Sequence, residues 1–252
     1  WSVVPTASGI YYYDLLNKAY MVFNGQISSI SDTKMMHSYF ISNTELEGLK
    51  IDNPLIKQGI SSGYDQINKD IFMTFHRNNK PFTISYNEAR NQFISFYDYL
   101  PSMYISKGQY FITTNPNLKS LYRQYAGNYN NFYGINYPSY VILNVNPEAD
   151  LDTVFDNIMY KSEVYLNDID QPDKTLTGVR LYSEYQDSGL IPLTVGRNSN
   201  LRRKFRDWNA ILPRNQGSRE RIRNPWVKLV LQFDNTSNYK LILHDIIVSY
   251  SI

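Results

Sequence analysis

The chain has 252 residues, a net charge of +2 and a mean hydropathy of −0.43, which fit a globular protein of one large or two small domains. The absence of cysteine excludes disulfides, thiol catalysis and Cys-ligated zinc or iron–sulfur sites. The longest apolar runs, such as residues 226–231, are much shorter than the roughly 20 residues that cross a bilayer, so no membrane span is expected. The 23 tyrosines favour pleated, half-buried strands and a mainly β protein.

Short apolar or alternating segments, bounded by turn residues, predict antiparallel strands along the chain. In chain order they cover residues 19–23, 71–75, 82–86, 92–96, 109–113, 139–145, 227–233 and 240–250. The first ends at Asn24-Gly25, a strong tight-turn pair, and the second is followed by a polar turn over residues 77–81. Residues 150–164 carry apolar side chains at helical spacing, and this stretch is either a helix or a strand flanked by loop.

A weak internal repeat consists of a tyrosine, an Asp or Asn, a few polar residues, a basic residue and a strand. It occurs at Tyr13-Asp14, Tyr64-Asp65 and Tyr86-Asn87. Physically, this pattern predicts a strand end, an Asx-type turn and a returning strand. Because repeated hairpins build propeller blades, we predict propeller-like antiparallel hairpin blades over residues 1–137, without requiring that they complete a propeller. An ordinary β-meander with the same turns is the alternative.

The residue pattern of the chain changes near residue 137, where the hairpin-rich, aromatic part ends. Beyond it come residues 150–164, which are either a helix or a strand, an acidic loop over residues 167–173, a basic stretch and two long terminal strands. We therefore predict a second, β-sandwich-like domain over residues 138–252, a common size for that architecture.

The search for catalytic residues is mostly negative. The three histidines, His37, His76 and His244, belong to no H-E-x-x-H motif, and G-x-S-x-G and Walker-type patterns are also missing from the sequence. In the last strand, alternation places His244 on the side opposite to its neighbours. We predict no enzyme and no catalytic, cofactor-binding or metal-binding residue. A glycosidase carboxylate pair stays open because its signature is spatial.

Two acidic groups have the residue types that could hold a hard cation such as calcium. One comprises Asp150, Asp152 and Asp156, and the other comprises Asp168, Asp170 and Asp173. The second resembles a calcium loop superficially but has neither its glycine nor its terminal glutamate. Solvated acidic turns are therefore favoured at both places.

The basic stretch from Arg197 to Lys228 is the most distinctive local feature, and only Asp207 and Glu220 oppose its positive charges. Arginine with interleaved aromatic residues suits either subunit contacts or phosphates and bases. The small net charge of the whole chain favours interface pairing over nucleic acid. The candidates for interface or DNA contact are Arg202, Arg203, Lys204, Arg206, Arg214, Arg219, Arg221, Arg223, Trp208 and Trp226.

Several longer motifs occur together. The middle of the chain reads YNEARNQFISFYDYLPSMYISKGQYFIT, NPNLKSLYRQ and NNFYG, and the end reads RKFRDWNAILPR, RERIRNPWVKLVL and KLILHDIIVSY. This combination resembles the C-terminal part of the tail muzzle (nozzle-like) proteins of crAss-like bacteriophages. Residues 202–250 carry the most specific part of the resemblance, which extends back to Tyr64 and more loosely to Tyr12.

The resemblance implies a structural virion protein that forms a ring at the distal end of a short tail and guides genome ejection. Its partners would be other copies of itself, other tail proteins and, transiently, exiting DNA. It would be made in the bacterial host cytoplasm, and the chain would be a C-terminal piece of a longer protein. The alternatives are a carbohydrate-binding or adhesive β module and a propeller glycosidase.

Overall fold

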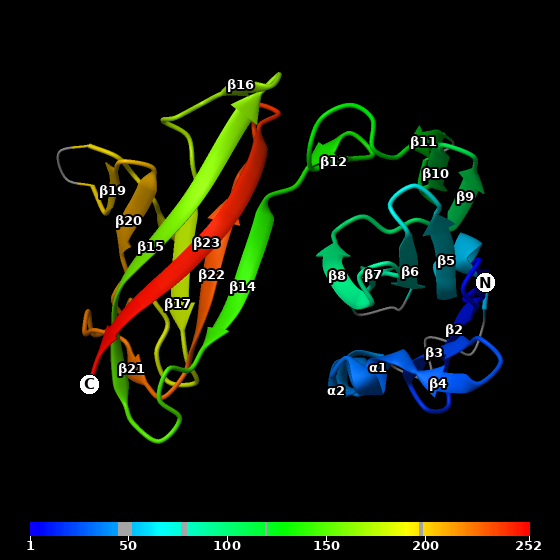
Figure 1. The fold of residues 1–252 in the computed structure, drawn as a ribbon, viewed down its shortest axis with the longest axis horizontal. Helices are drawn as coiled ribbons and strands as arrows, with labels where there is room; N and C mark the ends of the chain where they lie inside the picture. Colours follow the sequence, from blue (N-terminus) through cyan, green and yellow to red (C-terminus); the bar gives the residue numbers. More distant parts are fainter. Residues whose placement is uncertain (45–51, 77–79, 119, 197–198) are drawn as a thin grey trace. The chain divides into compact units, whose positions relative to one another are not determined.

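The computed structural model describes residues 1–44, 52–76, 80–118, 120–196 and 199–252. The chain divides into two compact units, Trp1–Gly127 and Asn128–Ile252, each built mainly of antiparallel β-sheets (Figure 1). The predicted mainly β class is therefore confirmed. Residue 137, where we predicted the domain boundary, lies just inside the second unit. Residues 77–79 of the predicted polar turn and Arg197 lie outside the described residues.

The first unit contains three sheets in which strands adjacent in sequence are also adjacent in space. One sheet joins β1 (Val4–Pro5), β2 (Ile10–Asp14), β3 (Ala19–Phe23) and β4 (Ile27–Ser29). The next joins β5 (Gly59–Asp65), β6 (Asp70–His76), β7 (Phe82–Asn87) and β8 (Gln92–Tyr97). The third joins β9 (Met103–Lys107), β10 (Tyr110–Thr114) and β11 (Leu121–Arg123). Propeller blades are four-stranded antiparallel sheets of this kind. That the sheets form a propeller stays a prediction.

The predicted repeat forms the turns of three hairpins in this unit. Asp14 accepts hydrogen bonds from the backbone N–H groups of Leu16 and Asn17, at 3.0 and 3.2 Å. Asp65 accepts one from Ile67 N–H at 3.0 Å, and Asn87 accepts one from Arg90 N–H at 2.7 Å. The last loop residue of each turn has a left-handed backbone, with φ of 49° at Lys18, 61° at Lys69 and 53° at Asn91. The Asx-turn prediction is confirmed.

An aromatic core joins the first two sheets of this unit. Tyr20 is fully buried and stacks on Tyr11 at 6.1 Å, while its ring meets that of Tyr86 edge-on at 5.9 Å. Two short helices close the core beside β4, α1 (Ile30–Thr33) and α2 (His37–Asn43), and they bury Ile30 and Phe40. A 3-10 turn, η1 (Pro54–Ile56), precedes β5. No helix in the described parts of the chain has the length and apolarity needed to span a membrane.

The second unit begins with the hairpin of β12 (Asn131–Phe132) and β13 (Ile135–Asn136) and continues into two larger sheets. One has the order β14 (Ser139–Val145), β22 (Val227–Phe233), β17 (Gly178–Tyr182) and β18 (Ile191–Pro192). The other has the order β16 (Ile169–Asp170), β15 (Thr153–Leu166), β20 (Asp207–Ile211) and β19 (Leu201–Lys204). Two further strands, β21 (Arg223–Asn224) and β23 (Lys240–Ser251), also pair with β15.

The two large sheets share one hydrophobic core, as the prediction of a sandwich requires. Ile158, Tyr160 and Val164 of β15 lie against Leu229 and Leu231 of β22, all buried. Figure 1 shows the long β15 and β23 passing in front of β17 and β22.

Residues 150–164, for which helix and strand were both open, form most of strand β15. A register shift between Phe155 and Asn157 leaves Asp156 as an extra residue in its pairing with β23. Phe155 and Ile158 consequently both face the core, which reproduces the i, i+3 spacing of a helix.

Candidate functional site

The structure separates the basic candidates into two groups. Arg202, Arg203, Lys204 and Arg206 form the hairpin group, on the β19–β20 hairpin. Arg214, Arg219, Arg221 and Arg223 form the loop group, in the connection between β20 and β22. Asp207, next to the hairpin tip, pairs with Lys161 of β15, whereas Arg223 pairs with Val154. Seven strand residues span about 23 Å, so the basic stretch is two surfaces and not one.

The hairpin group is partly fixed by packing. The guanidinium of Arg203 lies 5.3 Å from the centre of the Trp208 ring and donates a hydrogen bond to the carbonyl oxygen of Pro172. At the tip, Phe205 has a left-handed backbone, with φ of 58°, and its side chain is 88% exposed. The hairpin therefore presents an aromatic side chain between Lys204 and Arg206.

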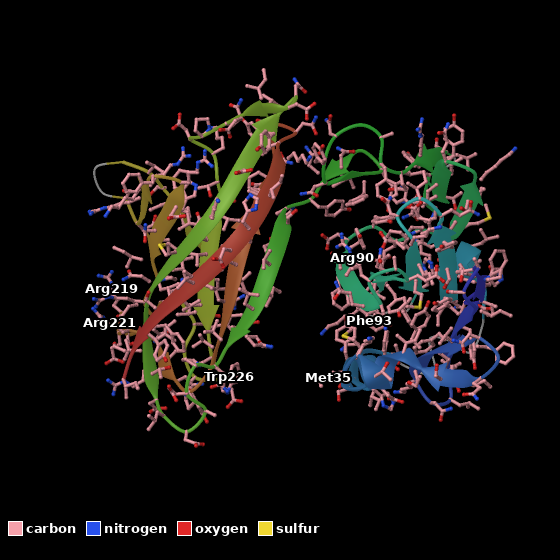
Figure 2. All side chains as sticks on the ribbon, viewed as in Figure 1. Met35, Arg90, Phe93, Arg219, Arg221 and Trp226 are labelled. Atoms are coloured by element: carbon pink, nitrogen blue, oxygen red, sulfur yellow. The ribbon has the colours of Figure 1, made fainter. Side chains whose placement is uncertain are left out.

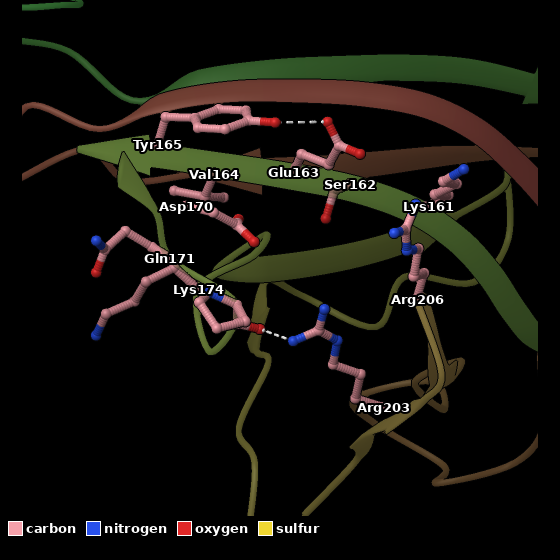
Figure 3. Close-up of a pocket in the computed structure, with 11 residues that line it drawn as sticks. Lys161, Ser162, Glu163, Val164, Tyr165, Asp170, Gln171, Lys174, Arg203 and Arg206 are labelled. Atoms are coloured by element: carbon pink, nitrogen blue, oxygen red, sulfur yellow. Dashed lines mark hydrogen bonds between the residues drawn. The ribbon is translucent and has the colours of Figure 1, made fainter. Parts of the chain in front are cut away.

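A cavity of about 200 Å³ lies beside this hairpin (Figure 3). Its charged lining comprises the cations Lys161, Lys174, Arg203 and Arg206 and the carboxylates Glu163 and Asp170. Lys161 and Lys174 were not among the sequence candidates. No local signal marks them, because they come from β15 and from the loop after β16, far from the basic stretch.

One of the two carboxylates already has partners. Glu163 accepts a hydrogen bond from the Tyr165 hydroxyl at 2.9 Å and lies 3.3 Å from Nε2 of His244. The pKa of Glu163 is lowered, first by the bond from Tyr165 and then by His244. The cavity wall thus carries more positive than negative charge that is free to meet a ligand.

Two members of the loop group, Arg214 and Arg221, line a second hollow of about 400 Å³ together with Asp156 and Pro213. Nη1 of Arg221 lies 2.6 Å from Oδ1 of Asp156, and Asp156 also accepts a hydrogen bond from Ser251. Arg219 and Arg221 project outward from the ribbon (Figure 2). The guanidinium of Arg221 is therefore paired within the chain, although its side chain remains 59% exposed.

The two tryptophan candidates have different positions. Trp208 is 2% exposed and packs in the core of the second unit, so its indole supports Arg203 from beneath and is not itself a surface group. Trp226 is half-buried and immediately precedes β22. Lys228, at the end of the basic stretch, lies 5.8 Å from the ring of Tyr182.

The described histidines have structural partners. His76 and Ser61 are 2% and 1% exposed, and Nε2 of His76 lies 3.2 Å from Oγ of Ser61. Both side chains hydrogen-bond the carbonyl oxygen of Pro101, at 2.9 and 2.7 Å. Burial lowers the pKa of His76. The serine thus donates its proton to a carbonyl and not to the histidine, so this pair is not arranged as a nucleophile and its base.

The acidic groups do not converge. Asp156 is held by Arg221, while Asp168 and Asp170 lie on and beside the two-residue turn between β15 and β16. Within the described residues, no group of three or more His, Asp or Glu side chains is placed to hold a metal ion.

These features define the structural class of the protein. It is a protein of two antiparallel β units, the second a sandwich that carries two separate basic surfaces on its hairpins and loops.

Comparison with known proteins gives the particular family. The sequence model of the Crassvirus muzzle protein matches residues 1–117, and that of the Crassvirus muzzle protein C-terminal domain matches residues 127–215. The chain is also 30% identical, over 256 aligned positions, to the muzzle protein of Bacteroides phage crAss001. That alignment covers 99% of this chain and 18% of the relative. The chain belongs to the muzzle protein family of crAss-like phages, as its motifs indicated.

Proposed function

We propose that this chain is a structural part of the phage tail and assembles with copies of itself into a ring around the distal tail channel. Its location would be the virion, and its role would be to shape the passage through which the genome leaves. The observation that carries this proposal is that both units match muzzle protein sequences. The chain spans 18% of the length of the crAss001 relative, so the assembly of the whole protein is part of the proposal.

The two basic surfaces support assembly by contact. The side chains of Arg202, Lys204 and Arg206 are exposed, and exposed arginines beside aromatic groups are common interface anchors. A permanent ring interface should bury well over about 2,000 Å². Rotational symmetry is expected because a head-to-tail contact between identical chains closes only in that way.

The four-stranded meanders of the first unit support the proposal that this unit consists of propeller-like blades. In this proposal, β1–β4 and β5–β8 are adjacent blades of a propeller-like region, and the sandwich of the second unit carries the subunit contacts.

Sedimentation velocity of the chain over a range of concentrations and salt tests the assembly. A ring predicts a discrete species several times the 29.5 kDa monomer mass, favoured at low salt. A chain that stays monomeric at high concentration and low salt contradicts the proposal. Electron microscopy of the assembled particle would give the symmetry directly.

Contact with exiting DNA has a separate test. Binding to duplex DNA should weaken steeply with salt, and Arg202→Ala should reduce the slope by about one counterion. Arg221→Ala should reduce it less, because Asp156 already pairs with that guanidinium. Binding that responds neither to salt nor to the Arg202 substitution would remove DNA from the proposal.

A further inference from the structure

Three cations in the wall of the hairpin cavity have no hydrogen-bond or ion-pair partner in the described parts of the chain. The side chains of Lys161, Lys174 and Arg206 make no hydrogen bond or ion pair with any described residue, whereas Arg203 is fixed on Trp208 and Pro172. Figure 3 shows the four cations around the cavity and the bond that ties Glu163 to Tyr165. Asp170 is the one lining carboxylate without a hydrogen-bond partner among the described residues, and it cannot balance three cations.

An exposed aromatic side chain, Phe205, is the sequence neighbour of Arg206, one of the cations that line this cavity. Phe205 is 88% exposed at a hairpin position with a left-handed backbone, where glycine or asparagine would be the ordinary residue. The Phe205 ring is therefore hardly buried by its own chain. The surface thus offers an apolar anchor beside unpaired positive charge, so its partner should combine carboxylates with an apolar group.

The same unit carries such a partner at its other end. Residues 148–152, between β14 and β15, have the sequence Glu-Ala-Asp-Leu-Asp, and all five are exposed. The carboxylates of Glu148, Asp150 and Asp152 bond to no described residue, and Leu151 is 46% exposed. Three carboxylates and a leucine at one end of the unit are therefore complementary to three cations and a phenylalanine at the other.

The two surfaces cannot meet within one copy. The acidic segment ends next to Thr153, where β15 begins, and Lys161 lies eight residues further along that strand. An extended strand covers about 26 Å over this length. We propose that residues 148–152 of one copy dock into the hairpin cavity of a second copy, with Leu151 against Phe205 and the carboxylates on Lys161, Lys174 and Arg206. This inference rests on the proposed ring and names the contact that builds it.

A contact between different surfaces of identical chains is head-to-tail, the type that generates rings. Burial of Leu151 and Phe205 would supply apolar area, while the charge pairs would fix orientation and speed encounter. Because the charges are initially exposed, the association should weaken as salt rises.

Charge reversal tests the contact. In sedimentation velocity, Lys161→Glu with Arg206→Glu should weaken self-association by about 10-fold or more, and Asp150→Lys with Asp152→Lys should do the same. A chain with all four substitutions regains complementary charges and should associate within about threefold of wild type. An equimolar mixture of the two double variants should also assemble, since each then offers matching surfaces to the other. The double variant Arg90→Glu with Lys107→Glu changes the net charge as the cavity variant Lys161→Glu with Arg206→Glu does, but on the first unit, and should associate like wild type.

The outcomes separate this contact from the ring itself. Wild-type assembly that neither double variant weakens would overturn the contact and leave the ring standing. Assembly lost in both double variants and not regained in the fourfold variant would also overturn it, since charge pairing would then not be the cause. If the cavity substitutions weaken DNA binding and leave association intact, the cavity holds phosphates instead. A wild-type chain that never associates would overturn both ring and contact. Circular dichroism of every variant confirms folding before the comparison.

Discussion

The hydroxyl group of Tyr64 donates a hydrogen bond to Glu88 over 2.8 Å, joining the end of β5 to the β7–β8 turn. The same carboxylate accepts a bond from Thr6 at 2.6 Å and another from Ser8, both from the loop after β1. One side chain thus ties the first sheet to the second. Burial by itself would raise the pKa of Glu88, but the bonds from Ser8, Thr6 and Tyr64 outweigh it and lower that pKa.

The first prediction is a pH-dependent loss of stability in Glu88→Gln. A carboxyl whose folded pKa lies below its unfolded value, about 4.3, contributes stability above that pH and loses it as the pH falls through the folded pKa. The substitution should therefore cost about 1–2 kcal/mol of unfolding free energy at pH 7 and much less near pH 3. Urea titrations of both proteins at the two pH values measure this difference. A cost that is equal at both would show that the charge is not what the hydroxyls stabilise.

The second prediction concerns the packing of β5 on β9. A Cβ atom added to Gly63 would lie 2.2 Å from Cβ of Tyr104, closer than any real contact. Gly63→Ala should lower the unfolding free energy by about 1–3 kcal/mol, because the strands must separate to admit the methyl group. Gly217→Ala is the matched control, since its added Cβ meets no atom within 4 Å. Equal stability of the two variants in urea would contradict this packing.

The third prediction separates the two aromatic residues of the β19–β20 hairpin. Trp208→Ala should cost about 3–5 kcal/mol, because the indole is 2% exposed in the core of the second unit. Phe205→Ala should stay within about 0.5 kcal/mol of wild type, because that ring is 88% exposed. Urea unfolding followed by circular dichroism gives both values. A large cost at Phe205 would mean that its ring packs within its own chain.

The fourth prediction concerns the repeated turns. Asp65 is 2% exposed and accepts bonds from Ile67 N–H and from Nδ2 of Asn68, at 3.0 and 2.6 Å. Asp65→Ala should cost about 1–3 kcal/mol, because it leaves both donors without their acceptor. Asp65→Asn should cost less, since Asn87 fills the equivalent place in the third turn and retains the acceptor oxygen. Thermal unfolding of the two variants would contradict this order if asparagine proved as damaging as alanine.

The local turns could be predicted from the sequence because their chemistry lies within a few residues. Asp14, Asp65 and Asn87 each accept bonds from backbone two or three positions ahead, so an Asx residue after a strand is enough to mark them. The short helices were missed for the opposite reason. Their stability comes from burying Ile30 and Phe40 against distant strands, and not from any repeated local pattern.

Irregular pairing limited the prediction of β15 and β23. A register shift next to Asp156 turned a strand pattern into an apparent helical one. A second shift pairs Lys161 with Asp245 and Ser162 with Leu243, which leaves His244 between them. His244 and Asp245 are consequently both exposed, so the prediction that His244 lies on the side opposite to Asp245 was wrong. Period-two alternation cannot reveal an extra residue in one strand.

The basic stretch could be found in the sequence, but the positions of its residues in space could not be predicted. Its residues are close in the chain, yet β20 carries the chain along β15 and separates Arg206 from Arg221. The cations that complete the hairpin cavity, Lys161 and Lys174, come from other strands and loops. Such a set is produced by sheet topology, which no local pattern records.

Strand β15 connects the acidic segment at its start with Lys161 of the cavity further along, and it lies between β20 and β23. In the proposed ring, a tensile load between neighbours would run along this strand. Because such a load acts parallel to the strand, it would stress the hydrogen bonds to β20 and β23 all at once. It would not break them one after another. The sandwich would then act as a stiff link, and such a load would strain the joints between copies before it extended the chain.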